Sequence, residues 1–189
     1  MKFRLLFLIL LLPFSSSADE TWSGVSNVYF KGYSNLHDFE GSIDKVPLKV
    51  TVAPGKEGRV VSAVTEVPVK QMSTHQEERD QNMMEMFQET AFRQIKVEVN
   101  RVPERELRPK GAKPGTMPVT LTIAGTRSVV NGSVSSLTES AGNVSFDLKF
   151  QVSLKAFKLK APGALAGLVR VKDPVDVVAH ITLKKEGAP

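Results

Sequence analysis

The chain has 189 residues, of which 41% are hydrophobic, with 25 Lys and Arg against 20 Asp and Glu, and it has no cysteine. This length suits one globular domain, and the composition is not that of a disordered chain. The lack of cysteine excludes disulfides, a thiolate nucleophile and iron–sulfur clusters, and three histidines leave little material for a metal centre.

The first eighteen residues have the pattern of a secretory signal peptide. Lys2 and Arg4 precede an apolar run over 5–12, and the small residues 16–18 end in a cleavage site after Ala18. A membrane-spanning helix needs about 20 apolar residues, so this run is too short to be an anchor. We therefore predict a cleaved signal peptide over 1–18 and a single mature domain over 19–189, located in the periplasm or secreted. Removal of two basic residues lowers the net charge from +5 to +3, which argues against nucleic acid as a partner.

Most of the mature chain alternates between apolar and polar residues, as strands with one dry face do. In chain order the predicted strands are Val28–Ser34, Phe39–Ile43, Leu48–Val52, the valine-rich run 59–69, Ile95–Val99, Val119–Ile123, Asn143–Leu154 and Val175–Lys184.

Turns separate these strands. Residues 55–58 lie between two of them, and 125–127 and 140–142 are short enough for hairpins. The stretch 103–118 contains four prolines and two glycines, which predicts a long loop. Strands with one wet face favour an antiparallel sheet, either closed as a barrel or folded as a sandwich.

One segment breaks the alternation. Thr74 and Glu77 have the spacing of a capping box, and Met83, Met84 and Phe87 follow on one helical face. We therefore predict a short helix. Its Met and Phe stripe either covers the core or lines an adaptable apolar pocket, because thioether side chains repack around varied ligands.

Catalytic motifs are missing from the sequence. It has no Gly-x-Ser-x-Gly elbow, no P-loop and no Gly-x-Gly-x-x-Gly. His37 and Asp38 are neighbours, but adjacent residues at the start of a strand would point to opposite faces. His75 is placed in the first helical turn and His180 on the wet face of the last strand. We therefore expect no catalytic residue, no metal site and no cofactor.

Three blocks of the sequence resemble the YceI-like family. Residues 34–41, Ser-Asn-Leu-His-Asp-Phe-Glu-Gly, resemble the Ser-x-Leu-His-Asp-(Phe/Trp)-x-Gly opening of one branch of that family. Arg79-Asp80, followed by Phe92, resembles its Arg-Asp-x-x-(Leu/Met)…Phe stretch. Residues 121–127, Leu-Thr-Ile-Ala-Gly-Thr-Arg, resemble its Leu-Thr-Ile-His-Gly-x-Thr-(Arg/Lys) hairpin. The blocks keep the family's order and spacing over nearly all of the mature chain.

The sequence also departs from the family pattern. Ala124 stands in place of a histidine before the glycine, and Arg93 and Ser128 stand in place of prolines. The 103–118 stretch resembles an insertion. Apolar alternation is kept in spite of these changes, so they bear on the ligand more than on the fold.

The resemblance implies an all-β fold: an exported, lipocalin-like, antiparallel eight-stranded barrel with one short helix between strands. Such a protein would hold a polyisoprenoid or quinone-type lipid in an apolar tunnel, and an eight-stranded barrel can enclose one small ligand. We expect that lipid as the partner, with transient membrane contact, no nucleic acid, and a monomer or homodimer. The predicted tunnel residues are Phe39, Leu121, Ile123, Phe146, Leu148, Phe150, Val152 and Leu154, with Met83, Met86 and Phe87 as a lid.

Three alternatives stay open. The first is a structural or interaction module with a filled barrel, which would use the charged 103–118 loop as its contact surface. The second is a lipid isomerase or hydrolase with His37 or Asp38 as the base. The third is an outer-membrane barrel, which the small, polar C-terminus at 186–189 and the few aromatic residues disfavour.

Overall fold

The computed structural model describes residues 19–160 and 171–187, so the predicted signal peptide lies outside the described residues. In chain order the elements are β1 (Glu20–Gly32), β2 (Phe39–Gly55), β3 (Gly58–Pro68), a 3-10 turn (Val69–Gln71), α1 (Glu77–Met86), β4 (Gln94–Pro103), α2 (Glu104–Leu107), β5 (Gly115–Ile123), β6 (Thr126–Ser140), β7 (Asn143–Val152) and β8 (Val175–Lys185).

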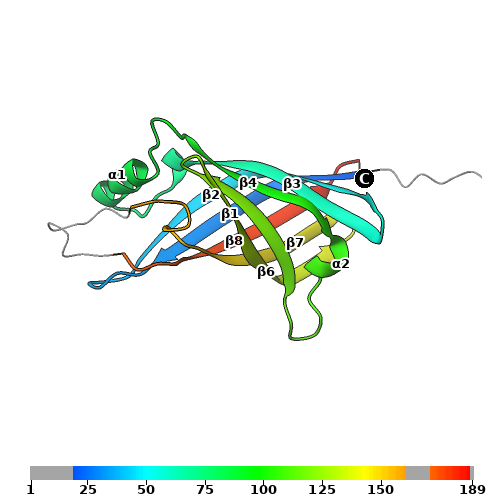
Figure 1. The fold of residues 1–189 in the computed structure, drawn as a ribbon. Coiled ribbons are helices and arrows are strands. Elements are labelled where there is room, and N and C mark those ends of the chain that lie inside the picture. Colours follow the sequence, from blue (N-terminus) through cyan, green and yellow to red (C-terminus); the bar gives the residue numbers. More distant parts are fainter. Residues whose placement is uncertain (1–18, 161–170, 188–189) are drawn as a thin grey trace, which may run out of the picture.

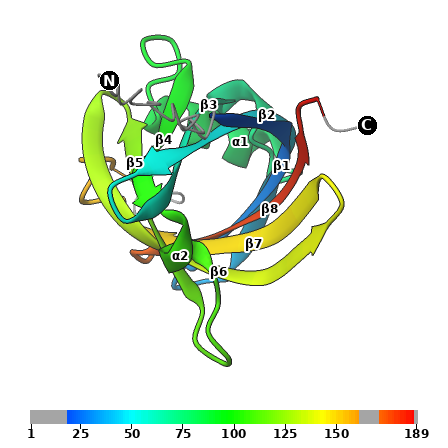
Figure 2. The same cartoon turned by 90° about the vertical axis from the view of Figure 1, so that its right-hand side faces the viewer.

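The strands form one closed antiparallel barrel. Each strand pairs with the next in the chain, and β8 closes the barrel by pairing with β1 from Trp22 opposite Lys185 to Lys31 opposite Asp176 (Figures 1 and 2). The predicted eight-stranded antiparallel barrel with a short helix between strands is therefore confirmed, and the sandwich is not adopted. Figure 1 places α1 at one end of the barrel and α2 toward the other.

The first two strands are longer than the alternation predicted. β1 begins at Glu20 instead of Val28, and β2 joins two predicted segments into one strand of 17 residues. β2 has a bulge opposite Asn27 of β1, because Asp44 and Lys45 both lie between the Val28–Ile43 and Ser26–Val46 pairs. There the backbone N–H of Lys45 donates to Asn27 Oδ1 at 2.9 Å. The bulge absorbs the irregular stretch of β2 that interrupts the apolar alternation.

The predicted capping box is wrong. The helix begins at Glu77, and the Thr74 hydroxyl donates to Asp80 Oδ1 at 2.6 Å instead of accepting from the N–H of Glu77. His75 lies before the helix with a φ of 58°, so its predicted place in the first helical turn is also wrong.

The long loop predicted for 103–118 is wrong at both ends. Glu104–Leu107 form the short helix α2, and β5 already begins at Gly115. Pro118 is tolerated in β5 because β4 pairs with β5 only at residues 120–122, so Pro118 has a partner strand on one side alone. Proline content therefore indicated a loop where barrel closure imposes a strand.

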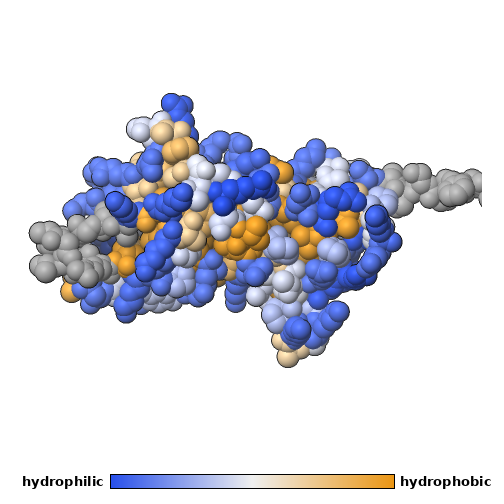
Figure 3. Space-filling view, viewed as in Figure 1, coloured by the Kyte–Doolittle hydropathy of each residue, from blue (hydrophilic) through white to orange (hydrophobic). Residues whose placement is uncertain are grey.

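Apolar side chains face the interior of the barrel, while its outside is mainly polar. The buried core draws residues from all eight strands and from α1. Figure 3 shows hydrophilic residues over most of one face, with apolar residues visible between them. Within residues 19–160 and 171–187, no helix has the length and apolar character needed to cross a membrane.

Candidate functional site

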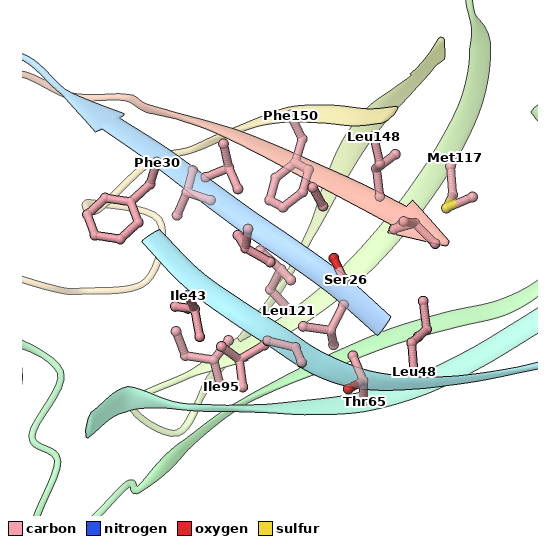
Figure 4. Close-up of a pocket in the computed structure, with 18 of the residues that line it drawn as sticks. Ser26, Phe30, Ile43, Leu48, Thr65, Ile95, Met117, Leu121, Leu148 and Phe150 are labelled. Carbon is pink, nitrogen blue, oxygen red and sulfur yellow. The ribbon is translucent and has the colours of Figure 1, made fainter. Parts of the chain in front are cut away.

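A cavity of about 780 Å³ runs through the interior of the barrel, with side chains from all eight strands and both helices along its wall. This volume falls within the range of roughly 300–1,000 Å³ typical of small-molecule sites. Figure 4 shows side chains of Phe30, Ile43, Leu121 and Phe150 entering the same space from different strands.

Small inward-facing side chains explain why the barrel is not filled. The interior of an eight-stranded barrel is just wide enough for side chains to fill it. Here many inward positions carry valine or alanine, which extend only a short way from the wall. Examples on six different strands are Val50, Val61, Val97, Val119, Val134 and Ala179.

All eleven residues predicted to bind the ligand line this cavity. Seven come from the strands: Phe39, Leu121, Ile123, Phe146, Leu148, Phe150 and Val152. Leu154 lies two residues after the end of β7, and Met83, Met86 and Phe87 come from α1 and its C-terminal end. Their placement on the cavity wall agrees with the prediction, whereas ligand contact by each residue stays a prediction.

Sequence reasoning missed the cavity residues of β1. Trp22, Ser26, Val28 and Phe30 all line the cavity. Their inward positions mix an indole, a hydroxyl and apolar groups, so the first half of β1 carries no apolar alternation. Val28 and Phe30, like Ile43 and Ile95, lie on strands that alternation did predict, so that signal was sufficient to find them.

The carboxylate of Asp80 anchors α1 over one end of the cavity. It accepts hydrogen bonds from Ser73 Oγ at 2.9 Å, from the N–H of Thr74 at 2.7 Å and from Thr74 Oγ1 at 2.6 Å. Ser73 in turn exchanges two backbone hydrogen bonds with Ser42 of β2. Burial would raise the pKa of Asp80, but the hydrogen bonds from Thr74 and Ser73 outweigh it and leave the pKa lowered. The helix is thereby tied to the barrel wall.

Two further contacts seat α1 on the cavity. The guanidinium carbon of Arg79 lies 5.4 Å from the centre of the Phe39 ring, a cation–π distance. Met83 and Phe87 are 8% and 6% exposed and line the cavity from the helix side. Arg79 and Asp80, from the second resemblance block, therefore both hold α1 against the end of the barrel.

The first resemblance block forms a tight turn at the same end of the barrel. Ser34 Oγ accepts from the backbone N–H groups of Leu36 and His37 and donates to the carbonyl of His37 at 2.6 Å. His37 and Asp38 lie between β1 and β2, so the strand geometry predicted for them is wrong. His37 lines the cavity at its rim, next to the 62% exposed side chain of Leu36.

A chain of ion pairs lies across the α2 end of the cavity. Arg59 contacts Glu20 at 2.8 Å and Glu104 at 3.2 Å, and Arg108 contacts Glu104 at 2.8 Å and Glu139 at 2.9 Å. All five residues line the cavity. Hydrogen bonds to Glu139 and Glu104 raise the pKa of Arg108, and those from Arg59 and Lys185 lower the pKa of Glu20. Both arginines are therefore already neutralised by carboxylates of the protein.

The histidines do not meet. His180 pairs with Asp147 across β7 and β8, His75 precedes α1, and His37 lies in the turn between β1 and β2. Among the residues that the structure describes, no group of three or more His, Asp or Glu side chains is arranged to hold a metal ion.

Comparison with known proteins places this geometry in a family context. A family model described as YceI-like domain matches residues 21–183. Burkholderia cenocepacia BcnA is similar in structure, with a TM-score of 0.64 and 17% identity over 83% of this chain and 95% of that one. A polyisoprenoid binding domain from Saccharophagus degradans, implicated in plant cell wall breakdown, gives a TM-score of 0.62 and 17% identity over 91% of this chain and 99% of that one.

The Campylobacter jejuni YCEI protein is also similar, with a TM-score of 0.51 and 14% identity over 77% of this chain and 84% of that one. At these identities the solved structures support the barrel fold alone. Among curated proteins, none matches the sequence.

Proposed function

This chain belongs to the YceI-like domain family, and from that premise we propose that it is an exported protein that binds a polyisoprenoid or quinone-type lipid inside its barrel. The observation that carries the proposal is the apolar cavity of about 780 Å³. The polyisoprenoid binding domain from Saccharophagus degradans, which shares the fold, supports this ligand class.

Binding of this kind requires burial of apolar ligand surface and no catalytic group. Each Å² of apolar ligand surface removed from water contributes roughly 25 cal/mol, so a long hydrocarbon tail can bind with few hydrogen bonds. The wall formed by Phe30, Leu121, Leu148 and Phe150 supplies such a surface. A structural module with a filled barrel does not fit a cavity of this size.

An enzymatic role has less support. Among the described residues His37 lines the cavity, and the hydrogen bonds that Ser34 makes to it involve its backbone. A general base needs an oriented imidazole, and these bonds do not orient one. We therefore propose a carrier without catalytic activity.

Export is the second part of the proposal. The signal peptide predicted over 1–18 would leave Glu20, the first residue of β1, as the second residue of the mature chain. The mature chain 19–189 would then be one barrel domain in the periplasm or outside the cell. The intact mass of the purified protein tests cleavage after Ala18 directly.

Analysis of extracted lipid tests the ligand. The full chain is expressed with its signal, purified from the exported fraction, denatured and extracted with organic solvent for mass spectrometry. We expect a prenyl lipid in the extract. A Leu121→Trp variant, which places an indole in the cavity, should yield less lipid. A native protein that carries no lipid in repeated preparations and takes up no added prenyl lipid would contradict the proposal.

A further inference from the structure

Two residues of β1 that line the cavity each carry a buried polar atom without a partner among the described residues. Ser26 is 6% exposed and lines the cavity, and Trp22 lines it nearer the α2 end. Among residues 19–160 and 171–187, neither Ser26 Oγ nor Trp22 Nε1 has a hydrogen-bond partner. Figure 4 shows the Ser26 oxygen among apolar side chains in the interior.

Such atoms are costly, because a buried hydroxyl or indole N–H gives up its water without gaining a hydrogen bond. Other polar groups on the same wall do have partners. The Thr65 hydroxyl lines the cavity and donates to the carbonyl of Pro47 at 2.6 Å, and the Thr74 hydroxyl donates to Asp80. Ser26 and Trp22 are therefore exceptions that call for a partner from outside the chain.

The positions of Ser26 and Trp22 distinguish the two ends of the cavity. Residues four apart on a strand share a face and are separated by about 13 Å. Ser26 lies midway along β1, and Trp22 lies closer to Glu20 and the ion pairs at the α2 end. The opposite half of the wall, toward α1, carries Phe30, Phe39 and Phe87.

The hydrogen-bonding groups of Ser26 and Trp22 favour a ligand with a neutral oxygen. Trp22 Nε1 can only donate a hydrogen bond, and the Ser26 hydroxyl can donate one too, so an acceptor atom of a ligand can pair with either of them. An anionic headgroup would need cations, but Arg59 and Arg108 are both paired with Glu104 and with a second carboxylate each. Burying an unpaired phosphate beside these carboxylates would be strongly unfavourable.

We propose that Ser26 Oγ, with Trp22 Nε1 as a second donor, forms a hydrogen-bonding subsite for a neutral oxygen-bearing headgroup, such as a quinone carbonyl. The prenyl tail then lies toward α1, against Phe30, Phe39 and Phe87. This inference rests on the proposed function and narrows it to prenyl lipids that carry a carbonyl or a comparable neutral acceptor.

Three probes of equal prenyl length test the subsite: a prenyl benzoquinone, a prenyl phosphate and the isoprenoid hydrocarbon without oxygen. Dissociation constants are measured by displacement of an apolar fluorophore from the delipidated full-length protein. Ser26→Ala should weaken the quinone about three- to tenfold and leave the hydrocarbon unchanged. Trp22→Phe should also weaken the quinone relative to the hydrocarbon.

Thr65→Val is the matched control, because it removes a cavity hydroxyl that already has a protein partner. It should leave the ratio of the quinone and hydrocarbon constants unchanged. Equal effects of Ser26→Ala on both probes, or no effect on either, would overturn the subsite, as would tightest binding of the phosphate. If wild-type protein binds none of the probes, the proposed function itself fails, which is a distinct result.

Discussion

Removal of the Asp80 carboxylate should release α1 from the end of the barrel. An Asp80→Ala variant loses three hydrogen bonds, from Ser73 Oγ, Thr74 N and Thr74 Oγ1. A hydrogen bond to a charged group contributes about 1.5–3 kcal/mol, and such bonds are not additive. Thr74 is 6% exposed, so water replaces its lost partner poorly. We therefore expect α1 docking to weaken by about 2–4 kcal/mol.

This loss should be local. α1 has only ten residues, and the barrel strands are held by their own ladders, so the helix can detach without unfolding the barrel. Hydrogen exchange followed by mass spectrometry should show amide protection in Glu77–Met86 falling by roughly 30- to 1,000-fold, with the strands unchanged. Release of a bound prenyl lipid should accelerate in the same variant.

Glu85→Ala is the matched control, because Glu85 is an exposed acid on the same helix. It should leave protection of α1 unchanged. Unaltered protection in Asp80→Ala, or the same loss in both variants, would refute the role assigned to Asp80.

The lowered pKa of Asp80 sets the pH dependence of the same contact. A carboxyl whose pKa is lower in the folded state stabilises that state above its unfolded pKa of about 3.9. That stabilisation is lost as the pH falls through the lowered folded value. Protection of α1 in the native protein, corrected for intrinsic exchange, should therefore hold from pH 8 to about pH 5 and decline below about pH 4. Asp80→Ala should show no such step.

Two further predictions concern the cavity and its far end. Leu121→Trp should narrow the cavity and reduce binding of a prenyl quinone at least tenfold in a fluorophore-displacement assay, whereas Val129→Trp, at a 62% exposed site on β6, should not. Equal binding by both variants would contradict the cavity as the site. Glu104→Gln removes the carboxylate shared by Arg59 and Arg108 and should lower the free energy of unfolding in urea by about 1 kcal/mol, less in 1 M salt; a loss that salt does not reduce would argue against an ionic origin.

Apolar alternation was sufficient to predict most of the barrel. The dry face of β7 supplied Phe146, Leu148, Phe150 and Val152, and each lies on the cavity wall because the dry side of a closed barrel is its interior. Local signals were less reliable. The Thr74 hydroxyl satisfied the spacing rule for a capping box, yet it bonds Asp80, because a nearby carboxylate is a stronger partner than a backbone amide.

The volume of the interior could not be predicted from alternation. Valine at Val50, Val61 and Val134 satisfies the same apolar pattern whether a barrel is filled or encloses a cavity. What decides between the two is how far side chains on facing strands extend, and that depends on register around the closed barrel. Pairing of β1 with β8, between residues far apart in the chain, is part of that register and has no local sequence signal.

The start of β1 lacks apolar alternation for a physical reason. The inward positions Trp22, Gly24 and Ser26 combine an aromatic ring, a missing side chain and a hydroxyl, so no alternation marks them as a strand. A sequence selected for packing alone would place apolar residues there, because the cavity wall around them is apolar. Positions where local rules fail without gain in stability are expected at functional sites. Under the proposed subsite, the unpartnered atoms of Ser26 and Trp22 mark the part of the wall where recognition of a ligand, rather than folding of the barrel, would explain the residues present.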